Sequence, residues 1–168
     1  TTRTNMKNTF LSFAILIIAS LSANAQLRPT LRCPNFEVDV LAGTVNDLLP
    51  KSAVSEIQAT LPCFTATIIK DSATTCAGVF YKDRDINFYT DRRYIEIGEK
   101  FKGKITPALM GASRTSLFRV LGHPKLKDTN WDAFQMGYGT LVLYYNKAGK
   151  INKIQLANKT TDDLKLCN

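Results

Sequence analysis

The sequence has few of the residues from which metal sites and hydrolytic sites are built. Histidine occurs once, at His123, and none of the four cysteines forms a C-x-x-C pair. Structural zinc sites combine four closely spaced cysteine and histidine ligands, so we expect no bound metal and no other cofactor. A G-x-S-x-G motif is missing, and a lone histidine directly before Pro124 is more typical of a helix end than of a catalytic base.

Two further patterns also argue against an enzyme. Gly111-Ala112-Ser113 lacks the lysine and the glycine spacing of a phosphate-binding loop. We interpret the acidic pairs, Asp83 with Asp85 and Asp162-Asp163, as solvated charges of a turn and of a polar tail. Cysteines that form disulfides leave no thiol nucleophile. The sequence therefore predicts a protein without catalytic residues.

No apolar run in the N-terminal region is long enough for a membrane-spanning helix. The run Phe10–Leu21 has 12 residues, fewer than the roughly 18–20 that a span requires. It follows Lys7 and precedes Ala23-Asn24-Ala25, which is the order of regions in a secretory signal peptide. We take Met6 as the start and expect cleavage before Gln26. The mature chain is thus predicted to be exported, periplasmic or extracellular, with no transmembrane segment.

The charge is basic but has no lysine or arginine run. Without residues 1–25 the chain keeps 20 basic and 14 acidic residues, a net charge of +6. Export and the scattered charges argue against a nucleic-acid partner. Two interpretations stay open: an ordinary mixed-charge surface, or attraction to anionic envelope polymers or to an acidic protein. We expect the partner to be an exported or envelope protein.

The cysteines Cys33, Cys63, Cys76 and Cys167 all lie in the exported part, where disulfides form. Four cysteines allow three connectivities. We favour Cys63 with Cys76, which are neighbours in sequence, and Cys33 with Cys167, which would join the two ends of the mature chain.

An internal repeat organises the rest of the sequence. Gly43–Leu61 matches Gly103–Leu121 at an offset of 60, and Cys76–Asp91 matches Asp132–Lys147 at an offset of 56. This predicts a leader and signal peptide (1–25), a lead-in with a first strand (26–42), repeat 1 (43–102) and repeat 2 (103–168) with a polar C-terminal tail.

Each repeat is predicted to hold a helix and three antiparallel strands, an α+β fold with helices on one face of joined sheets. Ser52 would cap the first helix, and Ser113 or its neighbour the second. The third strands would cover Arg93–Ile97 and Ile151–Leu156, after turns rich in Gly, Asn and Asp. Period-2 alternation then assigns one buried set of residues: Ile86, Phe88, Ile95, Ile97, Val142, Tyr144, Ile154 and Leu156.

Tyrosines and leucines on the other strand positions form the candidate binding face. Tyrosine offers a large contact area with a polar tip, which suits protein recognition. The candidate residues are Tyr81, Tyr89, Tyr94, Trp131, Leu143 and Tyr145. The alternative is that loops or the other repeat cover this face.

Several segments carry a family resemblance: Leu109–Ser113, Leu121–Pro124, Trp131–Phe134 and Leu141–Ile151. On these the chain resembles the β-lactamase-inhibitor-protein-like family of secreted tandem repeats. Repeat 2 is also similar to the small lipoprotein of the β-barrel assembly machinery. The resemblance implies two sheets aligned into one curved surface and a non-catalytic, inhibitor-like or adaptor-like protein-binding module. A second function stays open: an envelope component that binds anionic material or assists outer-membrane assembly.

Overall fold

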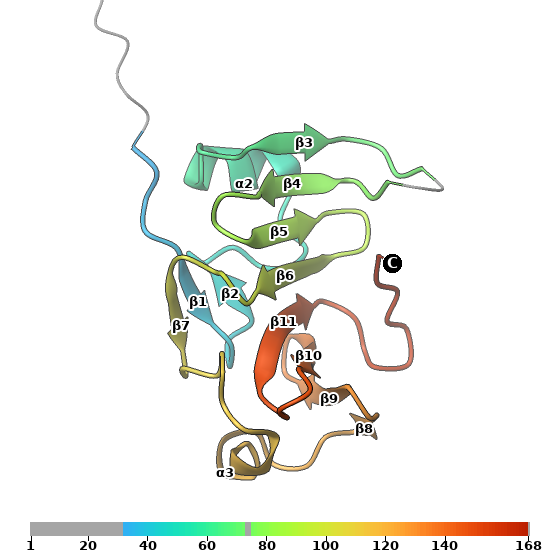
Figure 1. The fold of residues 1–168 in the computed structure, drawn as a ribbon. Coiled ribbons are helices and arrows are strands. Elements are labelled where there is room, and N and C mark those ends of the chain that lie inside the picture. Colours follow the sequence, from blue (N-terminus) through green and yellow to red (C-terminus); the bar gives the residue numbers. More distant parts are fainter. Residues whose placement is uncertain (1–31, 73–74, 168) are drawn as a thin grey trace, which may run out of the picture. The chain divides into compact units, whose positions relative to one another are not determined.

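An eight-stranded antiparallel sheet is the main feature of the fold (Figure 1). The computed structural model describes residues 32–72 and 75–167. The strand order is β3-β4-β5-β6-β11-β10-β9-β8, so the β6–β11 pair joins the first four strands to the last four. The strands are β3 (Ala66–Ile68), β4 (Gly78–Tyr81), β5 (Ile86–Tyr89), β6 (Tyr94–Gly98), β8 (Leu126–Lys127), β9 (Trp131–Met136), β10 (Gly139–Tyr145) and β11 (Ile151–Ala157).

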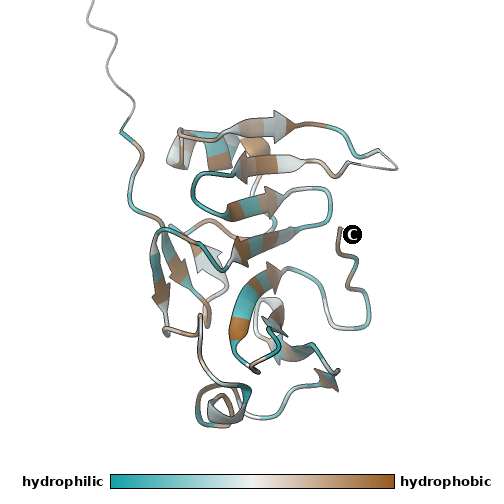
Figure 2. Cartoon of the chain, viewed as in Figure 1, coloured by the Kyte–Doolittle hydropathy of each residue, from teal (hydrophilic) through white to brown (hydrophobic). Residues whose placement is uncertain are grey.

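Polar turns connect these strands where the sequence predicts them. Figure 2 shows hydrophobic residues interspersed with hydrophilic ones along the strands. Between β10 and β11, the Asn146 side chain accepts hydrogen bonds from the backbone N–H groups of Ala148 and Lys150 at 3.0 and 3.1 Å. Gly149 in this turn has a φ of 68°, a conformation that glycine adopts without steric cost. Local turn chemistry therefore fixes this hairpin.

A smaller sheet packs its apolar residues into the same core. Its strands are β1 (Glu37–Asp39), β2 (Thr44–Val45) and β7 (Lys104–Thr106), in the order β2-β1-β7. β1 runs antiparallel to β2 and parallel to β7. The first strand that the sequence predicts is thus present as β1.

The helices are short, and the predicted fold class of two helix-plus-strand repeats is wrong, because the protein is mainly β. α2 spans Val54–Thr60 and begins after Ala53; the Ser52 hydroxyl does not cap it but accepts a hydrogen bond from the Leu49 N–H at 3.2 Å. Pro62 disfavours helical backbone at the residue before it, so α2 cannot continue past Leu61.

The second predicted helix divides into two pieces. A 3-10 turn, η2 (Arg114–Ser116), is followed by α3 (Phe118–Leu121), and Ser113 makes no side-chain cap hydrogen bond. α3 stops at Gly122, which has a φ of 72°. Of the residues predicted to form its apolar face, Leu117 is buried but Val120 is 47% exposed. Four helical residues cannot present a continuous apolar stripe, since one stripe needs at least two turns.

One face of the large sheet, the inner face, meets the core. Residues directly opposite in antiparallel strands share a face, so the register defines its members. They are Val79, Tyr81, Ile86, Phe88, Ile95, Ile97, Ile154, Leu156, Leu141, Leu143, Phe134 and Asp132. Ile57 and Leu61 of the α2 segment, Val38 and Val45 of the small sheet, and Leu109 and Leu117 belong to the same core.

The structure corrects the facing of β10. Val142 and Tyr144 were predicted to face the core, but the register places Leu141 and Leu143 there, opposite Leu156 and Ile154. Two residues connect β9 to β10, whereas four connect β4 to β5. The alignment of Cys76–Asp91 with Asp132–Lys147 therefore does not match the strand pairing of the structure. A shift of one residue in register moves every side chain of a strand to the opposite face.

Both disulfides join cysteines in a pairing that differs from the favoured one. Cys33 pairs with Cys63 and Cys76 with Cys167, with Cα–Cα distances of 5.4 and 6.4 Å. The antiparallel β3–β4 pair explains the difference. Cys63 precedes β3 and Cys76 precedes β4, so the two cysteines lie at opposite ends of this hairpin. Two disulfides are compatible with an oxidising, exported environment.

Within residues 32–72 and 75–167, no helix has the length and apolar character needed to cross a membrane. The predicted leader and signal peptide, residues 1–25, lies outside the described residues.

Candidate functional site

The opposite face of the large sheet, the outer face, carries the half-exposed aromatic and charged side chains of the strands. By register its members include Ala66, Ile68, Phe80, Asn87, Tyr89, Tyr94, Glu96, Trp131, Val142, Tyr144, Lys153 and Gln155. Three regions follow one another across this face: a groove, a polar row and an aromatic pair.

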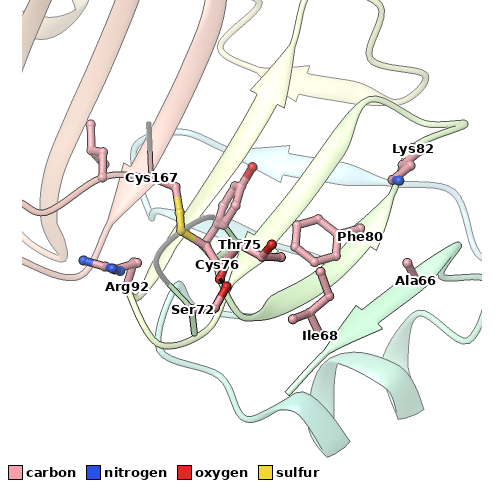
Figure 3. Close-up of a pocket in the computed structure, with 11 residues that line it drawn as sticks. Ala66, Ile68, Ser72, Thr75, Cys76, Phe80, Lys82, Arg92 and Cys167 are labelled. Carbon is pink, nitrogen blue, oxygen red and sulfur yellow. Dashed lines mark hydrogen bonds between the residues drawn. A yellow bond between two sulfur atoms is a disulfide. The ribbon is translucent and has the colours of Figure 1, made fainter. Parts of the chain in front are cut away.

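The first region, the outer groove, lies at the β3–β5 end and has a volume of about 520 Å³. Its sheet side is formed by Ala66, Ile68, Phe80 and Tyr89, and the Phe80 and Tyr89 rings meet edge to face at 5.5 Å. Figure 3 shows the Cys76–Cys167 disulfide with Arg92 on one side and Phe80 and Ile68 on the other, and Lys82 beyond Phe80. The groove therefore combines an apolar floor with cationic margins.

Of the two cations, one already has a partner. The Arg92 Nε donates a hydrogen bond to the Asp71 carboxylate at 3.0 Å, and both side chains are about one-third exposed or less. Lys82 is exposed and forms no ion pair with a described residue. Lys82 is thus the cation available to an acidic group placed at the groove.

The second region, the polar row, crosses the middle of the sheet. Glu96 lies opposite Asn87 on one side and Gln155 on the other. The Gln155 Nε2 donates to the Glu96 Oε2 at 2.7 Å, and the Lys153 Nζ lies 3.6 Å from the same oxygen. Among the described residues, the buried oxygens Asn87 Oδ1 and Gln155 Oε1 have no hydrogen-bond partner. Such oxygens cost free energy when left unpaired, so the row is a polar feature that core packing does not explain.

The third region is the aromatic pair of Tyr144 and Trp131, which lie opposite each other on β10 and β9. Both side chains are half-buried. The Lys153 Nζ stands 4.2 Å from the centre of the Tyr144 ring, within cation–π range. Burial raises the pKa of the Tyr144 hydroxyl, and the Glu96 carboxylate raises it further. Tyr144 thus stays neutral at physiological pH and presents a hydroxyl donor on a half-buried ring.

The six predicted binding residues divide between the two faces. Tyr89 and Trp131 lie half-buried on the outer face. Tyr94 lies on the same face but is only 1% exposed. The other three are buried on the core side and cannot contact a partner: Tyr81, Leu143 and Tyr145. Their assignment to one shared surface is wrong, because turn lengths decide strand parity.

Phe80 and Tyr144 are outer-face aromatics that the sequence reasoning did not select. The alternation of Ile86 and Phe88 on β5, and of Ile95 and Ile97 on β6, identifies the core-facing side of those strands correctly. If β10 had been paired with β11 before it was compared with β5, Tyr144 would have been assigned to the outer face.

A buried ion pair occupies the end of the inner face. Asp132, 3% exposed, accepts hydrogen bonds from the Arg114 Nε at 2.9 Å and from the Tyr145 hydroxyl at 2.7 Å. The Arg114 Nη2 donates to the second carboxylate oxygen and to the Asp128 carbonyl. These contacts tie η2 to β9 and β10. The cluster is a structural clamp, since every polar atom of Asp132 is paired within the chain.

His123 lies exposed after α3, with its ring 4.6 Å from the Phe118 ring. No group of three or more His, Cys, Asp or Glu side chains in residues 32–72 and 75–167 is placed to hold a metal ion. Comparisons with protein-family models, curated proteins and solved structures found no match to this chain.

Proposed function

We propose that this protein is an exported, non-catalytic protein-binding module that holds a partner protein against the outer face. The observation that supports this most is the continuous outer band formed by Trp131, Tyr144, Lys153, Glu96 and Asn87, which leads into the outer groove. The band runs from the β9 side of the sheet to the groove beside the edge strand β3.

The chemistry of the band suits a protein partner. Trp and Tyr dominate the binding energy of protein interfaces because they bury large rigid surfaces and keep a polar tip. Lys153 and Glu96 are each held by neighbours before any partner arrives, which lowers the entropy lost on binding. The outer groove adds an apolar recess that one aromatic or aliphatic side chain of the partner can fill.

The experiment captures partners with the mature chain from the exported protein fraction of the producing cells. The chain with Trp131→Ala and Tyr144→Ala is used beside the wild type, and captured proteins are identified by mass spectrometry. Each partner is then produced and its Kd measured. We expect the double variant to weaken binding by at least about tenfold, since interface Trp and Tyr commonly contribute 2 kcal/mol or more.

Phe118→Ala is the matched control, because Phe118 is 58% exposed but lies on α3, outside the outer band. This variant should leave Kd unchanged. Equal loss in both variants would show that general hydrophobic exposure, and not the outer band, captures the partner. Salt separates the competing function: a steep weakening between low and moderate ionic strength would indicate binding of anionic envelope material through net charge.

A further inference from the structure

The C-terminal tail, residues 158–167, runs back over one end of the outer face. The Asn158 N–H donates to the Arg93 carbonyl at 2.9 Å, directly after β11. The Thr140 hydroxyl, which lies on the outer face of β10, donates to the Lys159 carbonyl at 2.7 Å. Farther along, the Asp162 carboxylate lies 3.2 Å from the Lys125 Nζ, just before β8. The tail therefore contacts residues at or beside β6, β10 and β8.

The tail ends at the outer groove. The Cys167 N–H donates to the Tyr94 hydroxyl at 3.0 Å, and Cys167 is bonded to Cys76. Leu166 lines the groove together with Phe80 and Tyr89. Tyr94 stacks on Tyr89 with ring centres 4.5 Å apart, so the tail's last residues rest against a pair of outer-face aromatics. One apolar side chain of the chain itself thus occupies part of the predicted binding surface.

We propose that the segment Thr160–Leu166 is a resident ligand of the outer face, held by the Cys76–Cys167 disulfide, and that this surface also takes a segment of the same chemistry from a partner protein. That chemistry is an acidic pair followed by leucines at alternate positions, as in Asp162-Asp163-Leu164-Lys165-Leu166. This inference rests on the proposed function, because it names the kind of segment that the outer face recognises.

Three features of the structure fit that segment. The tail turns at residues 161–163, where the Asp163 N–H donates to the Thr160 carbonyl at 3.2 Å, and Leu166 then reaches the groove. The groove floor is apolar and offers Phe80 and Tyr89 to a leucine. Lys125 pairs with Asp162 beside β8, the exposed Lys82 lines the groove toward the other end of the sheet, and the mature chain has a net charge of +6.

The disulfide explains why a free segment would not displace the tail from the oxidised chain. The tail is held at Asn158 by the sheet and at Cys167 by the disulfide. A segment tethered at both ends competes at an effective concentration of roughly millimolar or more. A partner therefore competes with the tail after it has bound the outer band, which raises the effective concentration of its own segment.

The test measures binding of a fluorescein-labelled peptide with the sequence of Thr160–Leu166, by fluorescence anisotropy. It compares the oxidised wild type, the full chain with Cys76→Ser and Cys167→Ser, and an open variant that also carries Leu166→Ser. We expect the peptide to bind the open variant at least about tenfold tighter than the wild type, with the cysteine variant between them. A control peptide with serine in place of Leu164 and Leu166 should bind the open variant at least about tenfold more weakly than the leucine peptide does.

Two binding results would overturn the inference. Equal affinity for the wild type and the open variant would place the peptide elsewhere on the molecule. Equal affinity of the two peptides would show attraction by charge alone. Circular dichroism and thermal melting test whether the open variant is folded. If it is folded and binds no peptide, the inference is also overturned.

A second measurement covers an open variant that fails to fold. In the cysteine variant, NMR should show Overhauser contacts between the Leu166 methyl groups and the side chains that line the outer groove, because the face itself holds the tail. Random-coil shifts for Leu166 would overturn the inference. The two proposals can fail separately. If changing Trp131 and Tyr144 abolishes partner capture but the open variant binds no peptide, this inference is refuted and the proposed function is supported.

Discussion

Replacing Asp132 by Asn should remove one of the main polar clamps of the fold. Asp132 is 3% exposed, and its two oxygens accept hydrogen bonds from two Arg114 nitrogens and the Tyr145 hydroxyl. Asparagine keeps the shape but loses the charge, and it turns an NH₂ group toward donors. At least one buried donor therefore loses its acceptor.

The size of the effect follows from the burial of each partner. Removing one member of a fully buried ion pair costs about 3–5 kcal/mol. The Arg114 side chain is 24% exposed, so water can partly replace the lost carboxylate. The remaining amide oxygen also still accepts one hydrogen bond. We therefore expect the free energy of unfolding to fall by about 2–3 kcal/mol, which corresponds to a Tm lower by about 6–10 °C for a chain of this size.

The assay is urea unfolding of Asp132→Asn, Arg114→Gln and the double variant, followed by circular dichroism. The double-mutant cycle should give a coupling energy above about 1 kcal/mol, because both changes remove the same interaction. Asp162→Asn is the matched control: Asp162 also faces a cation, Lys125, but its side chain is 75% exposed, so its loss should cost less than about 0.5 kcal/mol. A loss below that value for Asp132→Asn, or additive single effects, would refute the clamp.

Three further outcomes follow from other parts of the structure. Burial raises the pKa of several tyrosines above the ordinary value of 10.0, so the folded chain keeps protons that the unfolded chain releases; the tyrosine contribution to the free energy of unfolding should be constant below about pH 10 and should fall above it, as measured by urea titration at several pH values. Replacing Cys76 and Cys167, which are separated by 91 residues, should cost about 4.6 kcal/mol by loop entropy, against about 3.6 for the other disulfide, which spans 30 residues; the reverse order in thermal melts would contradict the loop-entropy account. Gly139→Ala would place a Cβ in steric conflict with the Ala157 carbonyl oxygen at a φ of 141° and should destabilise strongly, whereas Gly137→Ala meets no atom within 4 Å and should change Tm by less than about 2 °C.

Local chemistry in the sequence was enough to place most strands. The alternation of apolar and polar residues at Ile86–Phe88 and Ile95–Ile97 predicts a half-buried strand without any knowledge of the strand's neighbours, because a period of two residues is a property of extended backbone. The turn at Asn146–Lys150 is likewise set by its own side-chain hydrogen bonds. Helices were harder to predict, since seven-residue α2 and four-residue α3 depend on packing more than on their own propensities.

The candidate site was only partly predictable. Tyr89 and Trp131 do lie on the half-exposed face, but Tyr145 and Leu143 face the core. Nothing local distinguishes the two sets, because the face of a strand is set by its register with its neighbours. The position of Tyr94 under the tail depends on residues more than 70 positions away, as the Cys167 N–H contact shows.

Sequence alone was enough to predict β1, β4 to β6 and β9 to β11, the turns between them, and four cysteines in the part predicted to be exported. These properties depend on neighbouring residues and on the compartment. The tertiary structure alone decided the cysteine pairing, the faces of β9 and β10, and the covering of one end of the outer face by the tail. Each of those depends on strand order and register, where a shift of one residue exchanges core and surface.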